Sequence, residues 1–136
     1  MALGIEGGIA QELETAGFGT YDPSSAVADI RVGEEPATPD NVIVVLLVAG
    51  GRIPSRVSEE WFVSVRVRDV SYETAHSRLR DIAIYLQEKG QGNFGGISIG
   101  VLEPQGPPTG LGRDDQKRHR VEQIFSALMK RSFTFV

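Results

Sequence analysis

The residues with the clearest potential for chemistry form a glycine-rich turn, Gly90-Gln91-Gly92-Asn93-Phe94-Gly95, which fits the pattern G-x-G-x-x-G. In dinucleotide-binding proteins that pattern follows a strand and opens a helix, so that the helix N-terminus faces the pyrophosphate. Here the order is reversed, because an expected helix precedes the glycines and an expected strand follows them. The pattern therefore favours a helix-to-strand turn, and a small ligand-binding module that uses it is the weaker alternative.

Histidines and carboxylates add little further chemistry. The chain has no cysteine, which excludes disulfides, thiolate nucleophiles and cysteine-ligated zinc. His76 is expected on or beside the packing face of a helix, and neither it nor His119 has the spacing of a metal motif. The pairs Glu34-Glu35 and Glu59-Glu60 fall in expected loops, where solvation is their simplest state. We expect no catalytic group, metal or cofactor, and therefore no enzyme.

Length and composition indicate one ordinary globular domain spanning residues 1–136. Hydrophobic residues make up 40% and charged residues 24% of the chain. The net charge of -4 argues against stable nucleic-acid binding, and Asp114-Asp115 dilute the basic cluster Lys117–Arg120. The most apolar stretch, Val42–Ala49, is far shorter than the roughly 20 residues of a membrane-spanning helix, so no membrane contact is expected.

In the first half of the chain, residues 3–16 suit a helix in which Glu12 and Glu14 face water and which Gly17 ends. A short strand at 27–32 and a loop at 34–41 are expected to follow.

The clearest strand of the chain is expected at 42–49. Its uninterrupted apolarity predicts burial on both faces, with Gly50-Gly51 at its end and a loop over 50–60. Residues 61–69 alternate, which predicts a strand with one buried face and one wet or interfacial face. The first face would carry Val63, Val65 and Val67, and the second Phe62, Ser64, Arg66 and Arg68. Whether these arginines meet solvent or a neighbouring subunit is left open.

The second half begins with the strongest helix, residues 71–89, capped by Ser71 and ended by Gly90. Its apolar stripe consists of Tyr72, Ala75, Leu79, Ile82, Ala83 and Leu86. A strand is expected at 97–102 and a long partner-binding loop at 103–116. The last segment is ambiguous: Val121, Ile124, Phe125 and Leu128 fit a helical stripe, whereas Ser132–Val136 has the composition of a strand.

Three segments of the chain resemble the minor capsid, or tail terminator, family of long-tailed phages. The first is Thr38-Pro39-Asp40-Asn41 with the strand Val42–Ala49 and Gly50-Gly51. The second is Val63–Asp69 followed by Tyr72-Glu73-Thr74-Ala75. The third is Gly110-Leu111-Gly112-Arg113-Asp114-Asp115 running into Arg118-His119-Arg120. With the N-terminal helix and its Gly17-Phe18-Gly19 turn, the resemblance spans nearly the whole chain.

The resemblance implies an α/β domain of the α+β type, with a mixed β-sheet flanked by helices, and makes residues 120–130 a strand. It also implies a virion protein of the tail or neck, assembled in the host cytoplasm. Subunits of such proteins, commonly six, form a ring that caps the head-proximal end of the tail tube and ends tail polymerisation. The implied partners are further copies of the chain, the tail tube protein and a head-completion or connector protein.

A cyclic ring joins two different patches of each subunit. The residues that we expect at such interfaces are Arg52, Arg56, Arg66, Arg68, Arg113, Asp114 and Arg118. DNA would pass through the ring without specific binding, because an acidic lumen repels it. Another neck protein, a head-completion connector, is the main alternative.

Overall fold

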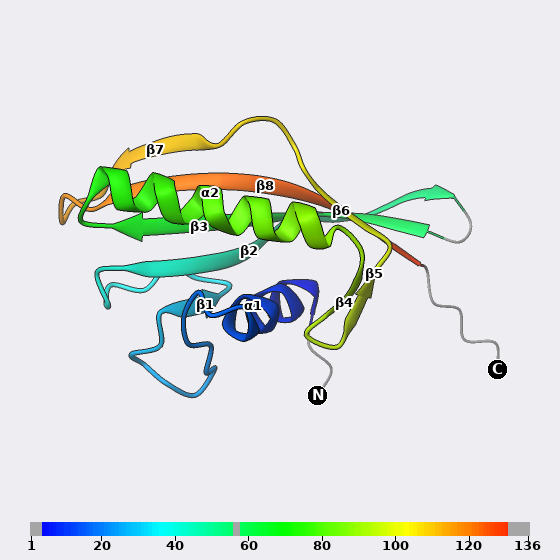
Figure 1. Ribbon diagram of the computed structural model, residues 1–136, viewed down its shortest axis with the longest axis horizontal. Coiled ribbons are helices and arrows are strands. Elements are labelled where there is room, and N and C mark those ends of the chain that lie inside the picture. Colours follow the sequence, from blue (N-terminus) through cyan, green and yellow to red (C-terminus); the bar gives the residue numbers. More distant parts are fainter. Residues whose placement is uncertain (1–3, 56–57, 131–136) are drawn as a thin grey trace.

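The computed structural model describes residues 4–55 and 58–130 (Figure 1). Within this part of the chain the elements in order are α1 (Ile5–Thr15), β1 (Ile30–Val32), β2 (Val42–Ser55), β3 (Ser58–Asp69), α2 (Tyr72–Lys89), β4 (Gly92–Phe94), β5 (Ile97–Ile99), β6 (Val101–Pro104), β7 (Thr109–Arg113) and β8 (His119–Lys130).

The larger sheet runs in the order β1-β2-β3-β8-β6, and β7 pairs with the same edge of β8 as β6 does, giving six strands in the described chain. Strand β1 is parallel to β2, and the other pairs are antiparallel. The sheet is therefore mixed. Strands β4 and β5 form a separate small hairpin beside α1.

Both helices pack on one face of this sheet, and the core lies between the two layers (Figure 1). Helix α1 contacts β1 and β2, while α2 contacts β3, β8 and β6. The strands contribute buried side chains at alternate positions, as pleating requires: Ile43 and Val45, then Val63, Val65 and Val67, then Val121 and Phe125. The expected α+β domain with a mixed sheet is confirmed, with both helices on the same side of the sheet.

The two helices are joined by a polar contact at their facing sides. The Tyr85 hydroxyl donates a short hydrogen bond to the Glu12 carboxylate, and Lys89 Nζ lies 3.6 Å from the other Glu12 oxygen. This hydrogen bond, with burial, raises the pKa of Tyr85 to about 12. The expectation that Glu12 faces water is wrong: the residue is 8% exposed, because α2 covers it.

Helix α2 forms as its local sequence predicts. The Ser71 hydroxyl accepts a hydrogen bond from the Thr74 N–H, and Gly90 takes the positive φ of 62° that ends the helix. Ala75, Leu79, Ile82 and Leu86 are fully buried. Tyr72, expected in this stripe, is instead 58% exposed, because it lies in the first turn beyond the edge of the core.

Several strand boundaries differ from the expected ones. Strands β2 and β3 extend through most of the expected 50–60 loop, because register shifts after Leu47 and Ala49 accommodate the glycines as bulges. The expected strand at 27–32 is reduced to β1, and the one at 97–102 is divided between β5 and β6. The expected 103–116 loop contains β7. Residues 120–130 are strand, as the family resemblance implied; 132–136 lie outside the described residues.

Helix α1 approaches the β4–β5 hairpin so closely that position 8 has no room for a side chain. A Cβ on Gly8 would lie 2.5 Å from the Phe94 carbonyl oxygen and 2.7 Å from Ile97 Cγ1. We predict that Gly8→Ala lowers the free energy of unfolding by about 1–3 kcal/mol, despite its better helix propensity, because overpacking outweighs that gain. Urea unfolding measures the change. The control is Gly110→Ala, whose Cβ meets nothing within 4 Å; equal stability of the two variants would contradict the packing.

Candidate functional site

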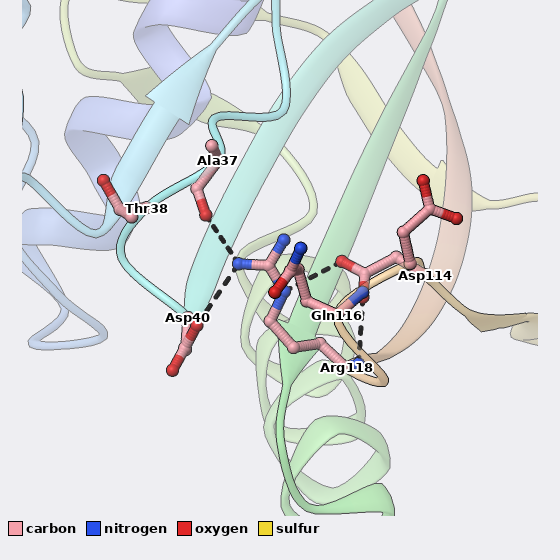
Figure 2. A pocket seen from close by; sticks show the side chains of 7 residues that line it. Ala37, Thr38, Asp40, Asp114, Gln116 and Arg118 are labelled. Atoms are coloured by element: carbon pink, nitrogen blue, oxygen red, sulfur yellow. Dashed lines mark hydrogen bonds and ion pairs between the residues drawn. The ribbon is translucent and has the colours of Figure 1, made fainter.

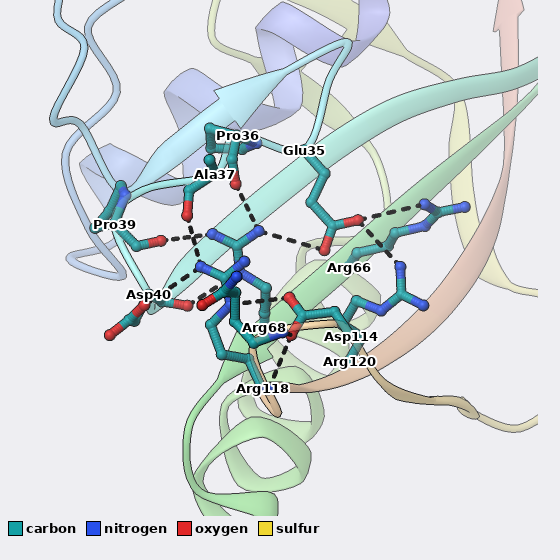
Figure 3. Close-up of polar contacts among 11 residues, drawn as sticks. Glu35, Pro36, Ala37, Pro39, Asp40, Arg66, Arg68, Asp114, Arg118 and Arg120 are labelled. Carbon is teal, nitrogen blue, oxygen red and sulfur yellow. Dashed lines mark hydrogen bonds and ion pairs between the residues drawn. The ribbon is translucent and has the colours of Figure 1, made fainter.

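The sheet face opposite the helices carries a cluster of charged residues, which we call the arginine cluster (Figure 3). Its members are Arg66, Arg68, Arg118 and Arg120 with Glu35, Asp40, Asp114 and Glu122. Cross-strand pairing places Arg66 opposite Glu122, and Arg68 opposite Arg120. The loop between β1 and β2 lies against these strands and supplies Glu35 and Asp40.

Arg68 holds this loop against the sheet. Its guanidinium donates to the backbone oxygens of Pro36 at 2.6 Å, Pro39 at 2.5 Å and Asp40 at 3.1 Å, and lies 3.6 Å from the Glu35 carboxylate. The Arg68 side chain is only 3% exposed. Burial, followed by repulsion from Arg118, lowers the pKa of Arg68, and the nearby carboxylates act in the opposite direction.

Arg118 makes a second connection to the same loop (Figure 2). Its guanidinium donates to the Ala37 oxygen at 2.6 Å and lies 3.3 Å from the Asp40 carboxylate, while its Nε donates to Asp114 at 2.8 Å. Asp114 also accepts the backbone N–H groups of Gln116 and Arg118. Asp114 thereby fixes the β7–β8 turn and orients Arg118 toward the loop.

The remaining two arginines share the Glu35 carboxylate. Arg120 Nη1 lies 3.4 Å and Arg66 Nη1 3.9 Å from the same Glu35 oxygen. Arg66 also donates to Glu122 at 2.7 Å, and this carboxylate accepts a hydrogen bond from Ser64. Among the described residues, Arg120 Nε is buried without a hydrogen-bond partner. Glu35 is therefore central to the cluster, and the expectation that it is simply solvated is wrong, because three arginines surround it.

The pKa values of two cluster carboxylates are lowered. Burial alone would raise the pKa of Asp114, but the hydrogen bonds from Arg118 and Gln116 outweigh burial. Burial would likewise raise the pKa of Glu122, and the hydrogen bonds from Ser64 and Arg66 reverse the shift. Both carboxylates are thus held ionised, and the four arginines face four carboxylates.

The contacts of these groups fix the loop and the turn of the chain against the sheet. In the described residues no group of three or more His, Asp or Glu side chains could hold a metal ion. A hollow of about 490 Å³ adjoins the cluster, lined by Ala37, Thr38, Asp40, Asp114, Asp115, Gln116 and Arg118 (Figure 2). The Arg118 guanidinium that reaches this hollow is already paired with Asp40 and Asp114. Neither described helix is long and apolar enough to cross a membrane.

The structure brings four of the seven predicted interface residues together: Arg66, Arg68, Asp114 and Arg118. Their contacts lie within the chain, and an interface role for them stays a prediction. Arg113 is exposed in β7, and Arg52 belongs to β2 opposite Glu60. Arg56 lies outside the described residues.

The partners of these residues that were not predicted from the sequence are Glu35, Asp40, Arg120 and Glu122. One signal was available: the three segments that carry the family resemblance supply Pro39 and Asp40, then Arg66 and Arg68, then Asp114, Arg118 and Arg120. Residues from the three segments that carry the family resemblance therefore lie together in the folded chain.

Beyond the cluster, the same face of the sheet is apolar and partly open. Leu46 and Ile124 flank Ser64 in the cross-strand register, and Phe62 and Leu128 lie further toward the β2–β3 hairpin. All four apolar side chains are partly exposed. No described helix covers this area, because both helices pack on the opposite face.

Comparison with known proteins gives a likeness of fold. No protein-family model and no curated protein matches the chain. A chain from the virion of a native gene transfer agent (GTA) particle matches with a TM-score of 0.59, at 10% identity, over 93% of this chain and 95% of that chain. At this identity the likeness shows a shared fold. A second solved structure matches at a TM-score of 0.43 and 13% identity over 79% of this chain and 82% of that chain, too weakly to support an argument.

The burial of Arg68 predicts that the loss of its guanidinium strongly lowers the free energy of unfolding. Arg68→Met should lower the free energy of unfolding by about 3–5 kcal/mol, because Glu35 and three backbone oxygens lose their buried donor. Arg66→Met, the matched control on the same strand, should cost about 1 kcal/mol or less, because that side chain is 31% exposed. Urea unfolding of both variants measures the difference. Equal losses would show that the loop does not depend on Arg68.

The lowered pKa of Asp114 predicts a pH dependence of stability. The unfolded chain binds a proton at the usual value of 3.8 and the folded chain only at lower pH, so stability rises with pH between the two values. The contribution is complete above the usual value and is lost as the pH falls through the folded value. Asp114→Asn should therefore flatten the acid limb of stability measured by urea unfolding against pH. Asp115→Asn is the matched control, and a flattened limb in that variant too would contradict the assignment.

Proposed function

We propose that this chain is a phage-type virion structural protein, a tail terminator that caps the head-proximal end of the tail tube as a ring. In that role it ends tail polymerisation and forms the joining surface for the head. The observation that carries the proposal is the whole-length fold likeness to a chain of the gene transfer agent virion, a phage-like particle. The sequence resemblance to tail terminators points to the same class independently of that likeness.

The arginine cluster supports this proposal because it joins the three segments of the chain that resemble tail terminators. The three segments on which the family resemblance rests are those whose side chains meet in the cluster. They hold the β1–β2 loop and the β7–β8 turn in one arrangement before any partner binds. A subunit preorganised in this way loses less entropy when it joins a ring.

The uncovered sheet face supplies surface for such an assembly. A cyclic ring needs two different patches on each subunit. Partly exposed apolar side chains such as Phe62 and Ile124 suit one of them, since the centres of protein interfaces are depleted in charge. The net charge of -4 per copy suits a ring through which DNA passes without specific binding. A non-enzymatic role belongs to the same proposal.

The decisive experiment combines the purified chain with tail tubes polymerised from the tube protein of the same particle. We predict rings by native mass spectrometry and negative-stain images with density at one end of each tube. Capping should stop further growth when fresh tube protein is added. A persistent monomer that leaves tubes growing would overturn the proposal. Binding to a portal or head component with no effect on tubes would favour a head-completion connector instead.

A further inference from the structure

Strand β2 has an edge that β1 covers only in part. The Ile43 N–H donates to the Asp29 oxygen at 2.7 Å, and the Val45 oxygen accepts from the Gly33 N–H at 3.0 Å, so both residues point their backbone groups toward β1. The pairing ends at Val32 opposite Val45. Since backbone groups alternate along a strand, those of Leu47 point to the same side, beyond the end of β1.

The uncovered stretch, Leu46–Ala49, which we call the β2 edge, is apolar and open. Leu47 is 44% and Val48 53% exposed. Edge strands are usually protected from pairing by charged residues, by proline or by bulges. From Val42 to Gly51 the chain has neither a charged residue nor a proline. The register shifts after Leu47 and after Ala49 are the protective features of this stretch within the described residues, and they limit any added strand to a few residues near Leu47.

The chain contains a short segment with the composition to pair with such an edge. Residues 131–136 read Arg-Ser-Phe-Thr-Phe-Val, in which apolar and hydroxyl side chains alternate. Alternation of this kind is typical of a strand that buries one face.

The geometry excludes the β2 edge of the same copy. Lys130 pairs with Ser58, which pairs with Ser55, so β8 ends at the end of the sheet where the β2–β3 hairpin lies (Figure 1). Measured along β3, which pairs Ser58 with Lys130 and Val63 with Leu47, the β2 edge lies about 17 Å from this end, at roughly 3.3 Å per residue. The outer side of β2 is also about 14 Å across the sheet from β8, at roughly 4.8 Å per strand, so the direct distance is about 22 Å. Thr134, four residues beyond Lys130, reaches at most about 14 Å.

From these observations we infer that residues 131–136 of one copy pair with the β2 edge of a second copy and add a strand to its sheet. Main-chain hydrogen bonds to Leu47 supply affinity, and Phe133 and Phe135 pack on the exposed apolar side chains. Each copy donates one segment and accepts one, so the contact is head-to-tail and closes into a ring when its rotation allows. The inference rests on the proposed self-association of the chain.

Cysteine cross-linking tests the pairing directly, because the 136-residue chain has no cysteine of its own. Tagged Val48→Cys protein is mixed with untagged Thr134→Cys protein and treated with a short bismaleimide. We predict about tenfold more cross-linked heterodimer than in the control mixture of Val27→Cys and Thr134→Cys. Val27 is an apt control because it is 79% exposed in a loop. Equal yields in the two mixtures, or an intramolecular cross-link in the Val48→Cys/Thr134→Cys double variant, would overturn the inference.

A second variant reports on the edge without chemical modification. Val48→Lys should lower the association constant measured by native mass spectrometry by about tenfold or more, because a charge on an edge opposes pairing. Val27→Lys is its control, and urea unfolding checks that both variants fold. Unchanged association of folded Val48→Lys would also contradict the inference. Rings that cap tubes without the Val48–Thr134 cross-link would refute this contact alone, whereas a monomer that ignores tubes would refute the proposed function.

Discussion

The architecture on the open face of the sheet depends on the burial of the Arg68 guanidinium. A charged group at 3% side-chain exposure is tolerated only when nearly all of its donors are satisfied, and here three loop oxygens and one carboxylate satisfy them. Burial lowers the pKa of Arg68 and repulsion from Arg118 lowers it further, while the carboxylates of Glu35, Asp114 and Asp40 act in the opposite direction. The β1–β2 loop and the β7–β8 turn are consequently fixed together.

The two faces of the sheet are stabilised by different physics. On one face, valines and isoleucines at alternate positions bury apolar area against α1 and α2, and the Glu12–Tyr85–Lys89 contact aligns the helices. On the other face the cluster covers only the end of the sheet near the loop. The rest of that face has no helix to cover it among the described residues, and its apolar side chains stay partly exposed.

Local signals predicted the elements that local interactions stabilise. Helix α2 was predictable because its cap, stripe and terminal glycine all lie within the helix and its first flanking residues. The stripe in β8 was ambiguous because Val121 and Phe125 belong to one sheet face and Ile124 to the other, a spacing that also fits a helix. The arginine cluster was out of reach, since its partners are up to 85 residues apart and several acceptors are backbone oxygens without a side-chain signature.

The pairing of the arginines inside the chain changes where an interface should be sought. Charged residues on a strand suggested a face that pairs with carboxylates of a neighbouring subunit, yet the carboxylates come from the chain's own loop and from β8. An arginine that is already paired with a carboxylate of its own subunit gains little binding free energy from a second carboxylate, because that carboxylate must first lose its hydration. Apolar side chains gain free energy when a partner removes them from water, and unpaired backbone groups at a strand edge can form new hydrogen bonds. These groups are therefore better suited to an interface than the paired arginines.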